Sequence, residues 1–172
     1  VDFYKNKFHV SENVLIPREE TELLVEKATG IISESTNKVF KILELGVGSG
    51  AVITSILLSS PRPLSAIATD VSQVALVEAK KNSVRLGVDV TYKHGDWWEA
   101  LDSKDGPFDL IITNPPYVGI DCYDKEETLS GYEPALSLYG KTPSKSGIRD
   151  IKKILSYASH WLNDNGKLLI EH

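Results

Sequence analysis

The sequence predicts an α/β protein with a parallel sheet that helices cover on both faces. The order of the predicted elements supports this class. From Val39 onward, apolar runs of strand length alternate with segments of helical periodicity. Alternating units of this kind are typical of parallel sheets that are buried on both faces. The chain has 172 residues, of which 41% are hydrophobic, and this size suits one domain with a single core.

Two elements are predicted before the sheet begins. Large and polar side chains alternate over 3–10 around the pair Asn6-Lys7, which favours a small hairpin. A helix is expected over 18–33, because apolar residues recur there at helical spacing and acidic residues occupy its first turn. The acidic residues are Glu19, Glu20 and Glu22, and the apolar ones are Leu24, Ala28, Ile31 and Ile32. The predicted division is a hairpin and helix over 1–38 and a main domain over 39–172.

The main domain is predicted to alternate strands and helices. Strands are expected at 39–45, 64–69, 88–94 and 108–113, and helices at 51–59 and 73–86. Ser72 suits the N-cap of the second helix and Gly87 suits its C-terminal stop. We expect three valines of this helix to face inward and three cations to face outward. They are Val74, Val77 and Val84, and Lys80, Lys81 and Arg85.

The last third of the chain starts with little periodicity. Residues 117–146 are rich in Gly, Pro and Ser, so a long functional loop with short helical pieces is expected there. An amphipathic helix over 148–162 then leads through a turn at 163–166 into a fifth strand at 167–171.

A glycine-rich loop joins the first strand to the first helix. Glycine permits a tight turn there and allows the backbone to approach a ligand closely. Asp70 ends the next strand, where a carboxylate can accept hydrogen bonds from the two hydroxyls of a ribose. The glycine pattern alone also fits the loose dinucleotide fingerprint, so NAD and a plain strand–helix turn remain alternatives. The candidate cofactor residues of the loop are Gly46, Val47, Gly48, Ser49 and Gly50.

Asp96 and Trp97 follow the third strand. A carboxylate can accept a hydrogen bond from an exocyclic amine, and an indole offers a flat apolar wall, so this pair suits an adenine. We expect the neighbouring Trp98 to be a core or surface-anchoring residue instead. A glycine loop, a ribose acceptor and an adenine wall thus stand in chain order at three strand ends, which indicates an adenosine site.

The tetrapeptide Asn114-Pro115-Pro116-Tyr117 follows the fourth strand directly. Each proline fixes φ near about −65° and removes a backbone donor. The result is a stiff corner that presents an amide side chain and free carbonyls at the carboxyl edge of the sheet, where ligands of open α/β sheets bind. Two acceptors there suit an –NH2 group. Asn114, Pro115, Pro116 and Tyr117 are therefore candidate catalytic residues, with a rigid turn of no catalytic role as the alternative.

Composition restricts the other classes. The net charge of −5 argues against broad binding to a phosphate backbone. The sequence has no apolar stretch of about 20 residues and no signal-peptide pattern. The single Cys122 cannot form an internal disulfide, which fits a reducing compartment such as the cytoplasm. The four histidines show no ligand spacing, so no metal site is predicted.

These motifs together resemble a known family. The glycine loop, Asp70, Asp96 and the Asn-Pro-Pro-Tyr corner are similar to class I S-adenosylmethionine-dependent methyltransferases of amino groups. The segment 17–22, Pro-Arg-Glu-Glu-Thr-Glu, resembles the signature of the HemK/PrmC family among them. Further segments at 95–97 and 131–134 also match that family. The similarity runs from Phe3 to His172.

The resemblance implies a Rossmann-like sheet with the parallel strand order 3-2-1-4-5. It implies S-adenosyl-L-methionine as cofactor, bound by residues 46–50, Asp70, Trp97 and Asn114, with S-adenosyl-L-homocysteine as product. The implied reaction is methylation of the glutamine side-chain amide in the Gly-Gly-Gln loop of peptide chain release factors, gripped by residues 114–117. It further implies a location in the cytoplasm, or in the mitochondrial matrix of a eukaryote, with no direct nucleic acid partner and no membrane.

Departures from the family leave alternatives open. Members usually carry an N-terminal helical domain and seven strands, so we expect this chain to be a fragment that lacks that domain and the last two strands. The segment 140–147 also differs from the more regular family loop. The alternatives are an adenine or guanine methyltransferase acting on DNA or RNA, a ribosomal-protein glutamine methyltransferase, and a piece that binds cofactor without turnover. Acidic charge and the segment 17–24 disfavour the nucleic-acid alternative.

Overall fold

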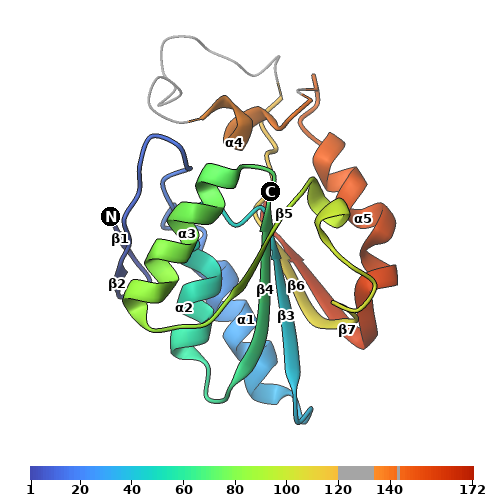
Figure 1. Ribbon diagram of the computed structural model, residues 1–172. Coiled ribbons are helices and arrows are strands. Elements are labelled where there is room, and N and C mark those ends of the chain that lie inside the picture. The colour runs from blue at the N-terminus through green and yellow to red at the C-terminus, as the bar shows by residue number, and fades with distance from the viewer. Residues whose placement is uncertain (120–133, 143) are drawn as a thin grey trace.

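The computed structural model describes residues 1–119, 134–142 and 144–172. Its main feature is a five-stranded parallel sheet with the order β5-β4-β3-β6-β7 (Figure 1). In chain order this is 3-2-1-4-5, so the predicted fold class and strand order are confirmed. The strands are β3 (Phe40–Leu45), β4 (Leu64–Asp70), β5 (Thr91–His94), β6 (Phe108–Thr113) and β7 (Leu162–Ile170).

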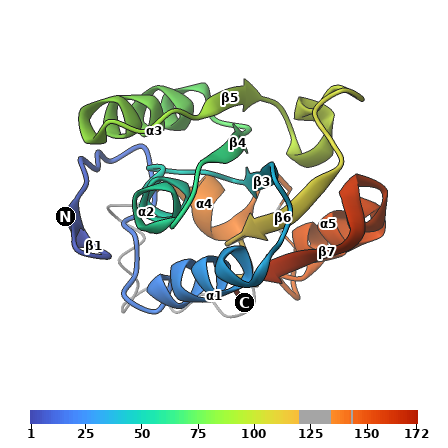
Figure 2. The ribbon, with the colours of Figure 1, turned by 90° about the horizontal axis from the view of Figure 1, so that it is seen from below.

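Helices cover both faces of the sheet (Figure 2). One face carries α1 (Glu22–Glu34), α2 (Ala51–Ser59) and α3 (Gln73–Leu86). The other face carries the short 3₁₀ helix η1 (Trp97–Ala100) and α5 (Arg149–Trp161). The short helix α4 (Ala135–Tyr139) lies beyond the carboxyl ends of the strands and is one of the helical pieces expected in the long loop. The remainder of that loop at 120–133 and 143 lies outside the described residues.

The central strand β3 contributes side chains to two cores. Phe40 and Ile42 pack with α1, α2 and α3, whereas Leu43 and Leu45 pack with η1 and α5. Because both faces are buried, the strand is apolar almost throughout, which is why its sequence predicted a parallel sheet. The strand ends that carry the candidate site are therefore held by a rigid frame.

The N-terminal hairpin is confirmed, but its turn differs from the expectation. Strands β1 (Asp2–Phe3) and β2 (Asn6–Lys7) pair antiparallel. The pair Asn6-Lys7 lies in the second strand, and the turn is formed by Tyr4 and Lys5 with φ of +43° and +65°. Two non-glycine residues with positive φ have no sequence signal as strong as Asn-Gly, so the register was not predicted. The hairpin shares one hydrophobic core with α1 and the sheet.

Helix α1 begins four residues later than predicted. Backbone turns from Arg18 to Glu22 precede it, so only Glu22 lies in its first turn. The expectation that Glu19 and Glu20 also lie there is wrong. The buried face of the helix comprises Leu24, Val25, Ala28 and Ile32.

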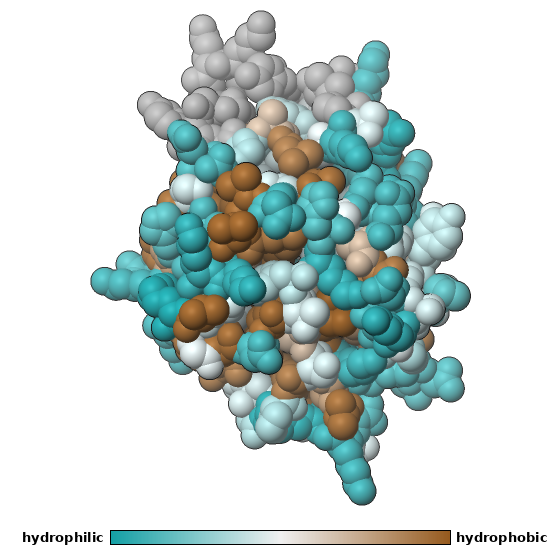
Figure 3. Space-filling view, viewed as in Figure 1, coloured by the Kyte–Doolittle hydropathy of each residue, from teal (hydrophilic) through white to brown (hydrophobic). Residues whose placement is uncertain are grey.

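Helix α3 has the predicted ends but the opposite buried face. Ser72 caps it by accepting from the Ala75 N–H, and Gly87 stops it with φ +75°. Its three valines were expected inward but are 46–69% exposed. Apolar and polar side chains are mixed on the face of the molecule that includes α3 (Figure 3). Apart from Leu76, the buried residues are instead small or polar, namely Ala75, Glu78, Ala79, Asn82 and Ser83. Small residues allow α3 to approach α2 closely, a packing requirement that hydrophobicity alone does not reveal.

Residues 9–21, which we call the N-terminal strap, explain the polar part of that face. The Ser11 N–H donates to Glu78 Oε1 at 2.7 Å, and the His9 N–H donates to Asn82 Oδ1 at 2.9 Å. Asn82 also donates to the carbonyls of His9 and Ser49. The buried polar groups of α3 thus fasten the strap across the helix.

Strand β7 also starts earlier than predicted. Residues 163–166, expected as a turn, lie within it, where the pairing with β6 shifts between Phe108 and Leu110. Asn165 has φ +67° there, so the turn chemistry of the sequence produces an irregular strand rather than a separate turn.

Candidate active site

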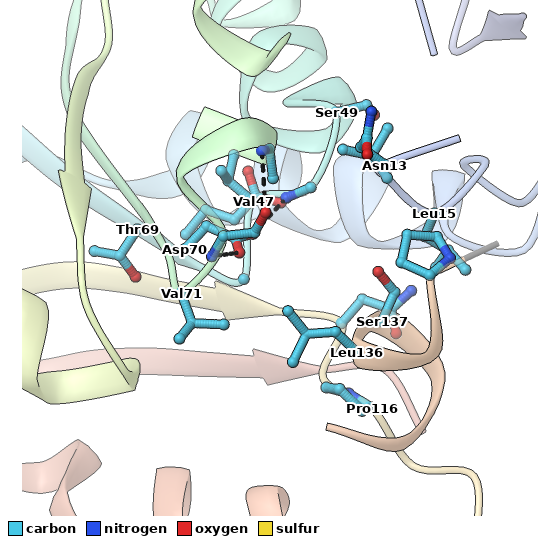
Figure 4. Close-up of a pocket in the computed structure, with 18 of the residues that line it drawn as sticks. Asn13, Leu15, Val47, Ser49, Thr69, Asp70, Val71, Pro116, Leu136 and Ser137 are labelled. Carbon is cyan, nitrogen blue, oxygen red and sulfur yellow. Dashed lines mark hydrogen bonds between the residues drawn. The ribbon is translucent and has the colours of Figure 1, made fainter. Parts of the chain in front are cut away.

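A cavity of about 290 Å³ lies at the carboxyl edge of the sheet, next to α4 (Figure 4). Its volume is close to the lower end of small-molecule sites, roughly 300–1,000 Å³. Ends of β3, β4, β5 and β6 all contribute to its lining. The predicted site residues that line it are Gly46, Val47, Gly48, Ser49, Asp70, Asp96, Trp97, Asn114 and Pro116. Gly50, Pro115 and Tyr117 are not among its lining residues.

The glycine loop is folded against the end of β4. The N–H groups of Gly46 and Val47 both donate to the Thr69 carbonyl at 2.9 Å. Gly46, Gly48 and Gly50 have φ of +72°, +53° and +78°, the left-handed region that favours glycine. Gly50 is the N-cap of α2 and packs against α3, which explains why it does not reach the cavity.

Asp70 connects the loop to the start of α3. Its Oδ2 accepts from the Gly48 N–H at 2.9 Å, and its Oδ1 accepts from the Ser72 N–H at 2.8 Å. Burial raises the pKa of the Asp70 carboxyl, and these backbone donors oppose that shift. An ionised carboxylate offers about four lone-pair sites. The backbone donors do not use all of these sites, so the carboxylate can still accept from a hydroxyl donor in the cavity.

Glu44 is a cavity residue that the sequence analysis did not assign. It is only 4% exposed, and its Oε2 accepts from the Ile53 N–H of α2 at 3.0 Å. Burial raises the pKa of its carboxyl well above the ordinary value, and the nearby charge of Asp70 adds to this shift. The signal available in the sequence was an acidic residue inside a strand whose only other polar residue is Lys41.

Asp96 and Trp97 lie where the adenine wall was expected. The Asp96 carboxylate lies 3.2 Å from Lys153 Nζ and 3.8 Å from Lys141 Nζ. The Trp97 indole lies against Gly46, where an added Cβ would meet its ring at 3.4 Å, and its Nε1 donates to Asp150 at 3.1 Å.

Trp98 behaves differently from its neighbour Trp97. It is buried in the core formed with α5 and stacks on Trp161 with ring centroids 6.3 Å apart. The expectation of a core or anchoring role for Trp98 is therefore confirmed.

Asn114 is held by two residues from distant parts of the chain. Its Nδ2 donates to Glu171 Oε1 at 2.9 Å and lies 3.4 Å from Thr21 Oγ1. Neither Thr21, which lies in the segment 17–22, nor Glu171, which ends the predicted fifth strand, was expected to contact Asn114. Tyr117, after the two prolines, is 44% exposed.

The N-terminal strap and α4 complete the cavity wall. The sequence predicted helical pieces in the long loop, but it did not predict that α4 or the strap would line the cavity. Figure 4 shows Asn13 and Leu15 of the strap together with Leu136 and Ser137 of α4 around the cavity. Pro134 also lines it, while the rest of the predicted segment 131–134 and Cys122 lie outside the described residues.

Two kinds of feature are absent from the described part of the chain. Within residues 1–119, 134–142 and 144–172, no group of three or more His, Cys, Asp or Glu side chains could hold a metal ion. No helix in these same ranges is both long enough and apolar enough to cross a membrane.

Comparison with known proteins identifies a matching family and similar proteins. Residues 42–136 match a family model described as a methyltransferase domain. A release factor glutamine methyltransferase of Lactococcus lactis subsp. lactis is 36% identical over 171 residues, covering 99% of this chain and 60% of that protein. A bifunctional methyltransferase of Rickettsia prowazekii is 34% identical over 190 residues, covering 99% of this chain and 35% of that protein. The chain thus spans 60% or less of the length of these two relatives.

Solved structures show the same fold at low sequence identity. A coclaurine N-methyltransferase bound to N-methylheliamine and SAH has a TM-score of 0.56 and 16% identity, covering 91% of this chain and 37% of that one.

Proposed function

Because the chain belongs to the methyltransferase domain family, we propose that it transfers a methyl group from S-adenosyl-L-methionine to a glutamine side-chain amide of a protein. The substrate glutamine is that of the Gly-Gly-Gln motif in peptide chain release factors, in the cytoplasm. Support for this substrate comes from the segment 17–22 and from the names of relatives that match almost the whole chain.

The lining of the cavity fits this cofactor. Gly46 and Gly48 have no Cβ, so their backbone can approach a ligand closely. Asp70 retains lone pairs for the ribose hydroxyls, and Trp97 with Asp96 would hold the adenine. When bound, the cofactor supplies an electrophilic methyl group on a positively charged sulfur. The product would be S-adenosyl-L-homocysteine, and the coclaurine N-methyltransferase of the same fold was solved with SAH bound.

The chemical difficulty lies in the substrate nitrogen. A carboxamide nitrogen is a weak nucleophile, because its lone pair is delocalised into the carbonyl. The Asn114 side-chain oxygen and the Pro115 carbonyl would each accept one N–H and direct the lone pair at the methyl carbon. In the proposed transfer the nitrogen would form a bond to that carbon and then lose one proton to solvent, and the electron pair of the broken carbon–sulfur bond would stay on sulfur. Positioning of this kind can lower a barrier by roughly 7–11 kcal/mol.

One observation carries the proposal: Asn114 and Pro116 line the same cavity as the glycine loop and Asp70. The proline-stiffened corner therefore borders the space where the cofactor would bind through Asn114 and Pro116, whereas Pro115, the proposed second acceptor, is buried beside the cavity. Tyr117 follows this corner and would close the site over the bound glutamine, excluding water.

An amino group of adenine or guanine in DNA or RNA would suit the same acceptors. The net charge of −5 disfavours this second candidate, because nucleic-acid affinity depends on clustered cations. A glutamine of a ribosomal protein is the third.

Transfer of a radiolabelled methyl group tests the substrate. The protein would be incubated with labelled cofactor and a release factor, with DNA, RNA and ribosomal proteins in parallel reactions. We expect label on the release factor and none on a release factor whose motif glutamine is replaced by alanine. Label on nucleic acid or on ribosomal protein instead would contradict the proposed substrate.

A further inference from the structure

Three residues from separate parts of the chain meet at the Asn114 amide. Asn114 Nδ2 lies 2.9 Å from Glu171 Oε1 and 3.4 Å from Thr21 Oγ1. The Thr21 hydroxyl in turn donates to the same Glu171 oxygen at 3.1 Å. Thr21 precedes α1, Asn114 follows β6 and Glu171 follows β7, so only the fold brings them together.

The hydrogen-bonding chemistry of these groups fixes which way the amide points. An ionised carboxylate only accepts hydrogen bonds, so the amide side that faces Glu171 must be the –NH2 side. The amide oxygen is then directed away from Glu171. Because Asn114 lines the cavity, this oxygen is available to a donor bound there.

The position of Glu171 is itself fixed by the sheet. Its N–H donates to the Thr113 carbonyl at 3.1 Å, directly before Asn114. Thr113 is buried and donates through Oγ1 to the Leu45 carbonyl at 2.8 Å. Asn114 and its carboxylate partner therefore sit on adjacent, paired strand ends.

The arrangement is not one that maximises stability. Burial raises the pKa of the Glu171 carboxyl, which means that its charged form is disfavoured there, although Thr21 and Asn114 partly oppose the shift. Its Oε2 is buried and finds no hydrogen-bond partner among the described residues. A half-buried carboxylate with one buried and unsatisfied oxygen calls for an explanation other than stability.

We propose that Glu171 and Thr21 are positioning residues that hold the Asn114 amide with its oxygen toward the substrate nitrogen. This inference rests on the proposed function and assigns a role to Thr21 of the segment 17–22. Without these partners the amide could turn over and present its –NH2 to the –NH2 of the substrate. Two donors would then face each other, and the acceptor pair would be lost.

Kinetics with paired variants test the inference in the full-length protein. Glu171→Ala removes the acceptor, whereas Glu171→Gln retains an acceptor oxygen of the same reach. We expect Glu171→Ala to lower kcat by at least about tenfold, with the Kd for S-adenosyl-L-methionine changed less than about twofold. Glu171→Gln should restore most of the rate. In a second pair, Thr21→Val removes the hydroxyl at similar side-chain volume, whereas Thr21→Ser retains it. We expect Thr21→Val to lower kcat, by less than Glu171→Ala does, and Thr21→Ser to keep most of the rate.

A second readout does not depend on substrate or turnover. The side-chain ¹⁵N–H2 signal of Asn114, identified by its absence in Asn114→Asp, should shift in Glu171→Ala and stay near its original position in Glu171→Gln. An unchanged Asn114 signal or an unchanged kcat in Glu171→Ala overturns the inference. If Glu171→Ala does not fold, the Thr21 pair decides by the same two measurements. If the unmodified protein methylates no release factor, the proposed function fails, and the Asn114 signal still decides the inference.

Discussion

Gly50 offers the sharpest test of how the glycine loop is supported. Alanine at this position must adopt the left-handed backbone with φ +78°, which costs about 1–2 kcal/mol. Its Cβ would also lie 3.0 Å from the Cβ and 3.1 Å from the Cα of Ala79. Because the Cα belongs to the backbone of α3, the loop and the helix must move apart, and overpacking of this kind costs typically about 1–3 kcal/mol. We expect Gly50→Ala to lower the free energy of unfolding by about 2–5 kcal/mol.

Gly87, the C-cap of α3, provides a matched control. It has φ +75°, and an added Cβ would meet no atom within 4 Å. Gly87→Ala should therefore lose only the backbone term of about 1–2 kcal/mol. Urea unfolding of both variants isolates the contact with Ala79 as the difference between them. Calorimetric titration with S-adenosyl-L-methionine should show weaker binding for Gly50→Ala alone. Equal losses of stability in the two variants would refute the reasoning.

Three further predictions concern the cavity. Asn114→Ala should reduce methyl transfer to background, because one of the two proposed acceptors is removed, and it should affect folding only modestly. Full activity of this variant in the labelling assay would contradict the assignment. Asp70→Asn should weaken cofactor binding by at least about tenfold, measured by calorimetry, whereas the exposed Asp89→Asn should leave it unchanged. Burial raises the pKa of Glu44 above its ordinary value of 4.5, so the folded state holds this proton longer than the unfolded state. The free energy of unfolding should therefore fall as pH rises above about 4.5, and urea titrations of Glu44→Gln should show a shallower fall.

The sheet was predictable because the sequence of each central strand shows where the strand lies. Residues of β3 and β6 are buried on both faces, so their sequences are nearly continuous apolar runs. The ends of α2 and α3 follow from local chemistry, a glycine loop in one case and Ser72 with Gly87 in the other. The resemblance to the HemK/PrmC family is likewise confirmed, since release factor glutamine methyltransferases match 99% of this chain.

The errors share a different origin. The inward face of α3 was mistaken because close packing selects Ala75 and Ala79 over larger valines, and the strap supplies partners for Glu78 and Asn82. Such choices depend on which segment lies opposite, and the hydrophobic pattern of one helix does not contain that information.

The same limit applies to the site. The glycine loop, Asp70 and the Asn114 corner are local motifs, so their positions in the sequence indicate a ligand site at the strand ends. Thr21 lies 93 residues before Asn114 and Glu171 lies 57 residues after it, and no local pattern links them. Glu44 was visible as a charge inside an apolar strand, but its contact with Ile53 appears only in three dimensions.

The path of the N-terminal strap along the cavity means that ligand binding should change how readily a protease cleaves the strap. The strap is pinned to α3 at Ser11, borders the cavity at Asn13 and Leu15, and reaches Asn114 at Thr21. A molecule filling the cavity would rest against it and oppose its fraying. Trypsin cleavage after Arg18 should therefore slow when cofactor is added, so that a simple gel would follow saturation without any methyl acceptor.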